Sequence, residues 1–162
     1  MNVQKIFRYL KGTLDYGINY SRNNNINEYV DADYDGDVET RRSTTGFLIT
    51  IGNVPTSWCS KLQHCVAIST AESEYYSISE CGKQCVWYLN ILNELNYNIN
   101  SIEINDDNKA AIYNSKYQSV NPRTKYIDVR FHYIRELVKD YKIKLKYIKS
   151  SNNLADGFTK YK

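Results

Sequence analysis

The 162-residue sequence predicts an α/β domain in which helices pack against one sheet, preceded by a short N-terminal segment. Three strand-type patterns come first in the main body, and helical and strand patterns then alternate to the C-terminus, in the order βββαβααβα. The sequence has no apolar run of about 18 residues, and its first residues lack the apolar stretch of a secretory signal. We therefore expect an intracellular protein that makes no membrane contact.

Residues 1–25 are expected to form a unit apart from the main body, residues 26–162. Apolar side chains recur at helical spacing from Val3 to Leu10, and Gly17–Tyr20 has the pattern of a short strand. The polar run Asn23–Asn25 resembles a linker. So short a segment cannot bury a core of its own. It must either pack on the body or be the remnant of a preceding domain.

Three strands are predicted at the start of the body, over Ile26–Asp33, Gly46–Ile51 and Val54–Lys61. Each is rich in β-branched, aromatic or other apolar residues. The dipeptide Gly52-Asn53 is a typical hairpin turn between the second strand and the third. Because the links are short, we expect an antiparallel meander.

A long helix follows, because apolar residues recur at alternating steps of four and three between Ala71 and Leu92. Ser69 and Glu72 have the spacing of a capping box, in which Glu72 would bond back to the Ser69 backbone. At about 100° per residue, Glu74 lies about 50° from the centre of the apolar stripe and Glu72 about 110° from it. Glu74 is therefore expected to face the sheet.

The remaining elements are assigned from periodicity and from start signals. A strand reached by a helical crossover is expected to lie parallel to the first strand. The two helices after it are separated by Asn121-Pro122, which is a typical helix start. In order, we predict a strand at Ile102–Asp106, a helix at Asp107–Ser115, a helix from Asn121 to Tyr141, a strand at Lys144–Ile148, and a last helix that includes Asp156 and is capped by Ser150 or Asn152.

Charge and cysteine content set weaker limits on function. The net charge of +3 is compatible with a locally contacted nucleic acid, and equally with an ordinary solvated surface. Cys59, Cys65, Cys81 and Cys85 form no C-x-x-C pair, although Cys81 and Cys85 have helical i, i+4 spacing. We expect reduced, mostly buried thiols, with a zinc site or a disulfide as the alternative.

Four acidic residues lie where predicted strands end or predicted helices begin: Asp31, Glu74, Asp107 and Asp156. Carboxylates at such ends can converge, and hard divalent cations are bound by oxygen ligands of this kind. The pattern predicts metal-dependent phosphodiester hydrolysis.

Two of these assignments stay open on periodicity alone. Asp31 and Asp33 share one face of their strand. Simple alternation also places Asp106, rather than Asp107, with the apolar residues of its strand.

The chain resembles the ribonuclease H domain of copia-type retrotransposon Pol polyproteins, and residues 1–25 resemble the end of the reverse transcriptase region before it. The order and spacing of the matching segments make the resemblance specific, and together they cover nearly the whole chain. The segments are Arg8–Gly17, Val30–Tyr34 with Gly36-Asp37, Arg42–Phe47, Ser57–Lys61, Ala67–Tyr75, Asp107-Asn108, Arg123–His132 and Leu154–Lys160.

The resemblance implies a ribonuclease H-like fold with a five-stranded mixed sheet, three strands antiparallel and two added in parallel, flanked by helices. It implies endonucleolytic cleavage of the RNA strand of an RNA·DNA hybrid during reverse transcription. The family's carboxylates fall, in order, on Asp31, Glu74, Asp107 and Asp156, so the resemblance favours Asp31 over Asp33 and Asp107 over Asp106. These four would bind two Mg²⁺ ions, for which Mn²⁺ can substitute. Asp31 and Asp107 would be central, and Glu74 and Asp156 would each favour one ion.

The resemblance also implies partners, namely an RNA·DNA hybrid and the reverse transcriptase portion of the same polyprotein. The setting would be the cytoplasm or retrotransposon virus-like particles. Side chains near the acids are candidates for substrate contacts, although ordinary solvation explains the basic ones equally well. The candidates are Ser69, Thr70 and Asn108 for ribose hydroxyls, and Lys61, Lys109, Arg123 and Lys125 for phosphates.

One feature departs from many ribonucleases H, which have a histidine in a loop shortly before the last Asp. Here Lys149–Asn153 contains none, and His132 lies within a predicted helix, where we expect it to be packed or at the surface. The missing histidine bears on turnover or product release and not on the metal site. Two readings remain, an active nuclease and a catalytically silent or domesticated domain that binds nucleic acid or a protein. An integrase or proofreading exonuclease is disfavoured by the Asp-x-Asp on the first strand and by the final Asp.

Overall fold

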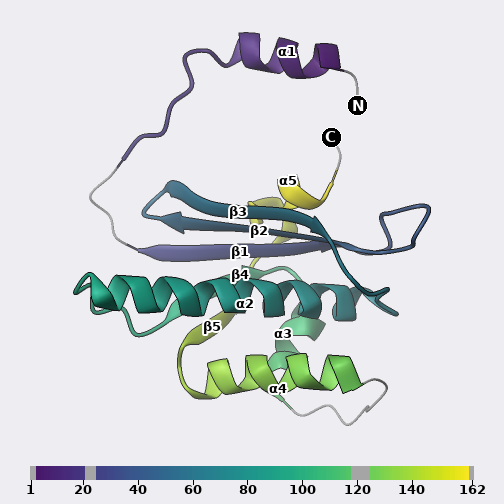
Figure 1. The fold of residues 1–162 in the computed structure, drawn as a ribbon, viewed down its shortest axis with the longest axis vertical. Helices are drawn as coiled ribbons and strands as arrows, with labels where there is room; N and C mark the ends of the chain where they lie inside the picture. The colour runs from purple at the N-terminus through teal and green to yellow at the C-terminus, as the bar shows by residue number, and fades with distance from the viewer. Residues whose placement is uncertain (1–2, 21–24, 118–124, 161–162) are drawn as a thin grey trace.

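The computed structural model describes residues 3–20, 25–117 and 125–160, with the backbone alone for residues 125–128. A five-stranded sheet in the order β3-β2-β1-β4-β5 forms its centre (Figure 1). The β1/β2 and β2/β3 pairs are antiparallel, whereas β1/β4 and β4/β5 are parallel. This arrangement confirms the predicted mixed sheet. The strands are β1 (Ile26–Asp33), β2 (Thr44–Ile51), β3 (Val54–Leu62), β4 (Ile102–Asp106) and β5 (Ile143–Tyr147).

Helices lie on both faces of the sheet (Figure 1). The long helix α2 (Thr70–Glu94) covers one face, and α4 (Lys125–Lys139) packs on the side of α2 that is turned away from β1. α3 (Lys109–Lys116) contacts both of these helices. The short helix α5 (Asp156–Thr159) lies on the opposite face, against β1 and β2. The order of strands and helices in the body is therefore the predicted one.

Two local predictions in this part of the chain differ from the structure, and a third is not tested. Gly17–Tyr20 forms no strand, because no neighbouring strand pairs with it in the described residues. The predicted Asp107–Ser115 helix begins at Lys109, since the Asn108 side chain accepts hydrogen bonds from the backbone N–H groups of Ala110 and Ala111 and so caps it. The predicted start at Asn121-Pro122 lies outside the described residues.

The segment before α5 also differs from its prediction. The candidate caps Ser150 and Asn152 lie in a short 3₁₀ helix (Ser150–Asn152), and α5 begins at Asp156 without a side-chain cap. Asn153 instead bonds to its own segment, its Oδ1 accepting from the Ala155 N–H at 3.1 Å.

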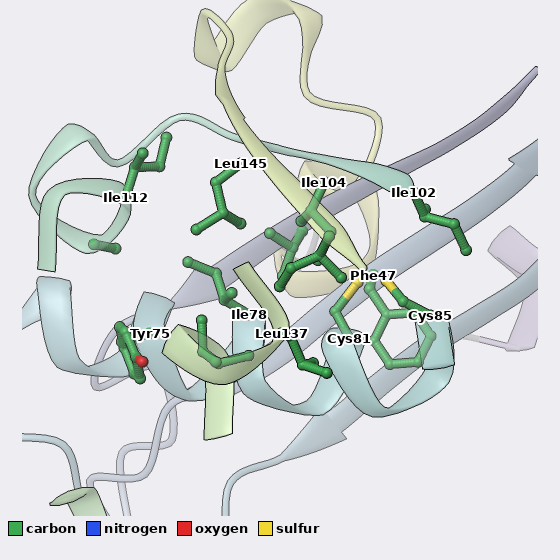
Figure 2. Close-up of a cluster of buried hydrophobic side chains, with 14 of the residues drawn as sticks. Phe47, Tyr75, Ile78, Cys81, Cys85, Ile102, Ile104, Ile112, Leu137 and Leu145 are labelled. Atoms are coloured by element: carbon green, nitrogen blue, oxygen red, sulfur yellow. The ribbon is translucent and has the colours of Figure 1, made fainter. Parts of the chain in front are cut away.

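The core lies between α2 and the sheet and continues to α3 and α4 (Figure 2). Ile78 and Ile104 are completely buried there, and the ring of Tyr75 packs on Phe131 of α4 with ring centroids 3.9 Å apart. α2 begins at the predicted cap, because the Ser69 side chain accepts from the Glu72 N–H at 3.2 Å. The Glu72 carboxylate accepts from the Ile68 N–H rather than from Ser69, which differs from the predicted capping box by one residue.

Strands β1 and β4 separate partway along their length, and this separation positions the candidate site. Their parallel pairing runs from Asn27 opposite Glu103 to Tyr29 opposite Asn105 and does not continue. β4 still pairs with β5 as far as Asp106, opposite Tyr147. The pairing of β1 with β4 therefore ends before the last residues of either strand, and we call this place in the sheet the opening.

The N-terminal helix α1 (Val3–Gly12) has no buried residue. Its apolar side chains at Val3, Phe7 and Leu10 are exposed, as are the aromatic residues that follow it. α1 therefore does not pack into the core of the body. Over the described residues, no helix has the length and apolar character to cross a membrane.

Candidate metal centre

Asp31 lies on β1 just beyond the point where β4 leaves it. Val30 faces α2 as part of the core, so strand alternation turns Asp31 toward α5 on the other face of the sheet. Its carboxylate is buried and accepts a hydrogen bond from the Thr159 hydroxyl of α5. Asp33 shares this strand face but is half-buried, and its carboxylate packs against Gly36 in the following loop.

Glu74 approaches the same opening from the α2 side of the sheet. It lies in the second turn of α2, is buried, and leaves Oε2 without a hydrogen-bond partner among the described residues. Glu72 is half-buried and bonded to the Ile68 backbone. The helical angle therefore separated the two acids correctly, since Glu74 is the one turned toward the sheet.

Asp106 ends β4 and Asp107 follows it, and the two side chains lie in different surroundings. Asp106 is completely buried, and its Oδ1 accepts from the Asn108 N–H at 2.6 Å. Asp107 is half-buried and joins the other acids. One carboxylate oxygen each from Asp31, Glu74 and Asp107 lies within 4.8 Å of the other two.

Asp156, the fourth predicted acid, is the first residue of α5 and is half-buried. It is not a member of the 4.8 Å group, but its charge acts on Asp31. Its Oδ1 forms an ion pair with the ammonium of Lys160, one helical turn later. α5 therefore brings a carboxylate, a hydroxyl and a cation to the same opening.

The pKa values of these acids reflect burial and mutual repulsion. Burial raises the pKa of Glu74 far above its ordinary value, and the negative charges of Asp106, Asp31 and Asp107 raise it further. Burial also raises the pKa of Asp31, while the Thr159 hydrogen bond and the Lys160 charge oppose the rise. The same burial raises the pKa of Asp106. Positive charge placed among these groups would stabilise their ionised forms.

The donor set fits a hard divalent cation. Three carboxylates converge from β1, α2 and the end of β4, and a buried Glu74 oxygen lacks a partner among the described residues. Mg²⁺ and Mn²⁺ prefer oxygen ligands of this type. Two cavities, of about 290 and 270 Å³, are lined by other residues and include none of the four acids. The carboxylates instead lie at the surface end of the opening, where Asp107 and Asp156 are partly exposed.

The predicted substrate-binding residues lie in three places. Ser69 and Thr70 are exposed at the N-terminus of α2, one turn before Glu74. Asn108 caps α3, and Lys109 places its ammonium over the Tyr147 ring, 4.6 Å from the centroid. Lys61 is exposed on β3 and lines the 270 Å³ cavity, away from the acids.

Arg123 and the side chain of Lys125 lie outside the described residues. His132 is exposed on α4.

Sequence reasoning did not assign roles to three residues that shape the site. Thr159 and Lys160 contact Asp31 and Asp156 directly, and their i+3 and i+4 spacing from Asp156 was the available signal. Asn153 donates from its side-chain amide to the Val30 carbonyl at 2.8 Å. That long-range contact left no local pattern in the sequence.

Comparison with solved structures defines the class of protein: the chain has a ribonuclease H-like fold. It superposes on the ribonuclease H1 of Halobacterium salinarum with a TM-score of 0.59 at 12% identity, covering 83% of this chain and 93% of that one. The structure of LC11-RNase H1 in complex with an RNA/DNA hybrid gives a TM-score of 0.62 at 14% identity, over 82% and 92% of the two chains. The protease-reverse transcriptase of prototype foamy virus gives 0.59 at 11% identity, over 89% of this chain and 22% of that one.

The curated relatives are Pol polyproteins of retrotransposons, and the chain is homologous to one segment of them. It is 42% identical over 159 residues to the retrovirus-related Pol polyprotein from transposon TNT 1-94 of Nicotiana tabacum. It is 32% identical over 161 residues to that from transposon RE2 of Arabidopsis thaliana. Each match covers 98% of this chain but only 12% and 11% of the relatives' length. No protein-family model matches the chain.

Proposed function

We propose that residues 26–162 form a metal-dependent ribonuclease H that hydrolyses the RNA strand of RNA·DNA hybrids during reverse transcription of a retrotransposon. The observation that carries this proposal is the meeting of the Asp31, Glu74 and Asp107 carboxylates where β1 and β4 separate. The ribonuclease H-like fold and the retrotransposon relatives support the same function.

Asp31, Glu74 and Asp107 would hold divalent cations together with Asp156, which would reach them from α5. Two bound Mg²⁺ ions would supply Lewis acidity for activating water and for stabilising the leaving oxygen of the phosphodiester. The Thr159 hydroxyl fixes the orientation of the Asp31 carboxylate. Lys160 places a positive charge beside Asp156, and this ammonium is partly exposed and would be available to a phosphate of the substrate.

The hybrid would lie across the surface end of the opening. The LC11 relative has been solved with an RNA/DNA hybrid, which shows that this fold can accommodate one. Ser69 and Thr70 would offer hydroxyl groups beside Glu74, and Lys109 would offer a cation beside Asp107. An A-form-like duplex displays ribose 2′-hydroxyls in a wide minor groove, where short polar side chains of this kind can contact them.

Residues 1–25 would be the end of a reverse transcriptase region. α1 presents an apolar face with no buried residue, as a segment cut from a larger core would. The relatives are polyproteins in which this chain matches a small fraction of the length. The partner of α1 would then be the reverse transcriptase portion of the same polyprotein.

The test is cleavage of an RNA·DNA hybrid with labelled RNA, at enzyme excess, with Mg²⁺ or with chelator. We expect Mg²⁺-dependent cutting of the RNA strand alone. Asp31→Asn, Glu74→Gln and Asp107→Asn should each abolish it. No cutting by the unchanged chain, together with no Mg²⁺ or Mn²⁺ binding by calorimetry, would support a silent domain instead.

Two matched controls use the neighbouring acids. Asp33→Asn changes an acid on the same strand face as Asp31, and Glu72→Gln changes one on the same helix as Glu74. Both variants should retain cleavage, because neither carboxylate belongs to the converging group. Equal loss in Asp33→Asn and Asp31→Asn would refute the assignment of the site.

A further inference from the structure

A second group of metal-ligating side chains lies inside the core, apart from the carboxylates. Glu28 of β1 faces α2, where Cys81 and Cys85 lie one helical turn apart. Figure 2 shows the two cysteine side chains on the same side of α2 with their sulfur atoms close together. One carboxylate oxygen of Glu28 and both sulfur atoms lie within 4.8 Å of one another.

Glu28 is an unusual residue for this position. It is completely buried, and its strand partners Ile49 and Ile104 are completely buried apolar residues. Its Oε2 accepts from the Cys81 thiol at 3.0 Å and from the Cys85 thiol. Its Oε1 is buried and has no partner among the described residues. Thiols are weak donors, so this carboxyl group lacks the strong partners that buried carboxyl groups usually have.

We propose that Glu28, Cys81 and Cys85 form a structural site for a thiophilic divalent cation, Zn²⁺ in the first instance. Two thiolates and a carboxylate are ligands that Zn²⁺ accepts, whereas Mg²⁺ avoids sulfur. The site is thus chemically distinct from the all-carboxylate group at the opening, and it does not depend on nuclease activity.

The geometry requires only small movements. With Zn–S near 2.3 Å and Zn–O near 2.0–2.2 Å, tetrahedral ligand atoms lie roughly 3.5 Å apart. The Cys81 and Cys85 sulfur atoms are 3.0 and 2.5 Å from Oε2, so they need to move outward by roughly 0.5 and 1 Å. Oε1 has no other partner among the described residues, so the Glu28 carboxylate can chelate the ion through both oxygens, which share one corner of a distorted tetrahedron. Three residues therefore supply four donor atoms.

Ion binding would exchange protons for the metal. Burial raises the pKa of both thiols, to about 12 for Cys85, so each holds its proton without an ion. Coordination releases both thiol protons and the proton of Glu28 where it is present. The ion's two positive charges then offset most of the three negative charges. Since all three residues are buried, the ion would enter as the chain folds.

The test refolds the full 162-residue chain under reducing conditions with Co²⁺ as a spectroscopic probe, and separately with Zn²⁺. We expect one Co²⁺ per chain, with sulfur-to-cobalt charge-transfer absorption and the visible bands of tetrahedral Co²⁺. X-ray absorption at the zinc edge of the unchanged chain should show two sulfur ligands. The double variant Cys81→Ser, Cys85→Ser should lose the bands, and Glu28→Gln should weaken binding by about tenfold or more.

Two controls locate the ion. The double variant Cys59→Ser, Cys65→Ser changes the other two cysteines, of which Cys65 is exposed, and should keep the bands. The double variant Asp31→Asn, Asp107→Asn should also keep them, because those acids belong to the other site. Bands lost with the Cys59, Cys65 variant, or no sulfur-coordinated ion in the unchanged chain, would overturn the proposal. The edge spectrum gives this answer even if the Cys81, Cys85 variant fails to fold.

Discussion

The side-chain amide of Asn153 donates to the backbone carbonyl of Val30 at 2.8 Å, across 123 positions of the sequence. The Val30 carbonyl lies beyond the last residue pair of β1 with β4, so it has no strand partner on that side. Asn153 thus replaces the missing strand and also bonds to Ala155, next to Asp156. A single buried amide therefore holds the opening of the sheet and positions the start of α5.

Asn153→Ala should destabilise the chain and weaken metal binding together. The substitution leaves a buried carbonyl unpaired, which costs about 1–3 kcal/mol of unfolding free energy. It also releases the start of α5, so the apparent Mg²⁺ affinity should fall. Urea unfolding and calorimetric Mg²⁺ titration measure the two effects. The control is Asn152→Ala, at the exposed neighbouring residue, which should change neither the unfolding free energy nor the Mg²⁺ affinity. Equal effects from both variants would show that the Val30 contact is unimportant.

Gly46 on β2 is required by the close approach of α5. A Cβ atom there would lie 2.5 Å from Thr159 Cγ2 and 3.2 Å from the Ala155 carbonyl oxygen. Gly46→Ala should therefore push α5 outward, with a loss of about 1–3 kcal/mol of stability. The Thr159 bond to Asp31 should break, and hybrid cleavage should fall sharply. Gly157→Ala is the matched control, since its Cβ would meet nothing within 4 Å. Full cleavage by Gly46→Ala would contradict the proposed role of α5.

Periodicity was sufficient for the elements of the body, because their apolar faces repeat at a fixed interval. β1 and β4 have the predicted bounds, and α2 begins after Ser69 as predicted. Elements without such repeats were predicted less well. Gly17–Tyr20 has strand-type residues but no pairing strand, and pairing is a tertiary property. The predicted side-chain cap of α5 is absent for a related reason, since the segment before α5 is held by Asn153, which bonds to β1 and to Ala155.

For the candidate site, the angular position on the helix was enough to choose Glu74 over Glu72 as the acid that faces the sheet. Strand alternation could not make the corresponding choice within the two pairs of aspartates. Asp31 and Asp33 are equivalent on an isolated strand, and they differ because α5 contacts Asp31 whereas the Asp33 carboxylate packs against Gly36 in the following loop. Asp106 continues the buried alternation of β4, as simple periodicity indicates, and Asp107 lies past the strand end near the other acids. The separation of two strands and the return of α5 over β2 are long-range features, so neither choice was accessible to local patterns.

The buried Glu28 should make the stability of the metal-free chain depend on pH. Burial raises the pKa of Glu28 from 4.5 to about 7 in the folded chain. Because the pKa is higher in the folded chain than in the unfolded chain, the folded state holds the Glu28 proton more tightly. This contribution to the unfolding free energy is fully present below pH 4.5 and is lost as pH rises to about 7. The unfolding free energy, measured with urea in the presence of chelator, should therefore fall over this range by an amount on the order of 3 kcal/mol.

Glu28→Gln should remove this part of the pH dependence, because the amide does not titrate. Glu94→Gln, at an exposed residue near the end of α2, should leave the pH dependence unchanged. If the slope between pH 4.5 and 7 is the same in Glu28→Gln and in the unchanged chain, Glu28 is not the titrating group.

Lys160 should oppose Mg²⁺ binding in the absence of nucleic acid. Its ammonium is paired with Asp156 and acts electrostatically on Asp31 and Asp107, so it lowers the negative charge that a divalent ion meets. The pair is partly exposed, with 49% of the Lys160 side chain and 24% of the Asp156 side chain accessible. Lys160→Gln should therefore tighten Mg²⁺ binding by no more than about fivefold.

Salt separates this charge effect from a structural one. Screening weakens the Lys160 contribution, so the gain in affinity should shrink as ionic strength rises from about 0.01 to 0.15 M. Calorimetric titrations at both ionic strengths measure this gain in Mg²⁺ affinity. The control is Lys144→Gln on β5, because Lys144 lies opposite Glu103 and away from the end of β4 at the site. Weaker Mg²⁺ binding by Lys160→Gln at both ionic strengths would mean that Lys160 supports the geometry of α5. If affinity rises while cleavage of the hybrid falls, the ammonium competes with the ion in the free enzyme and acts on the substrate once the hybrid is bound.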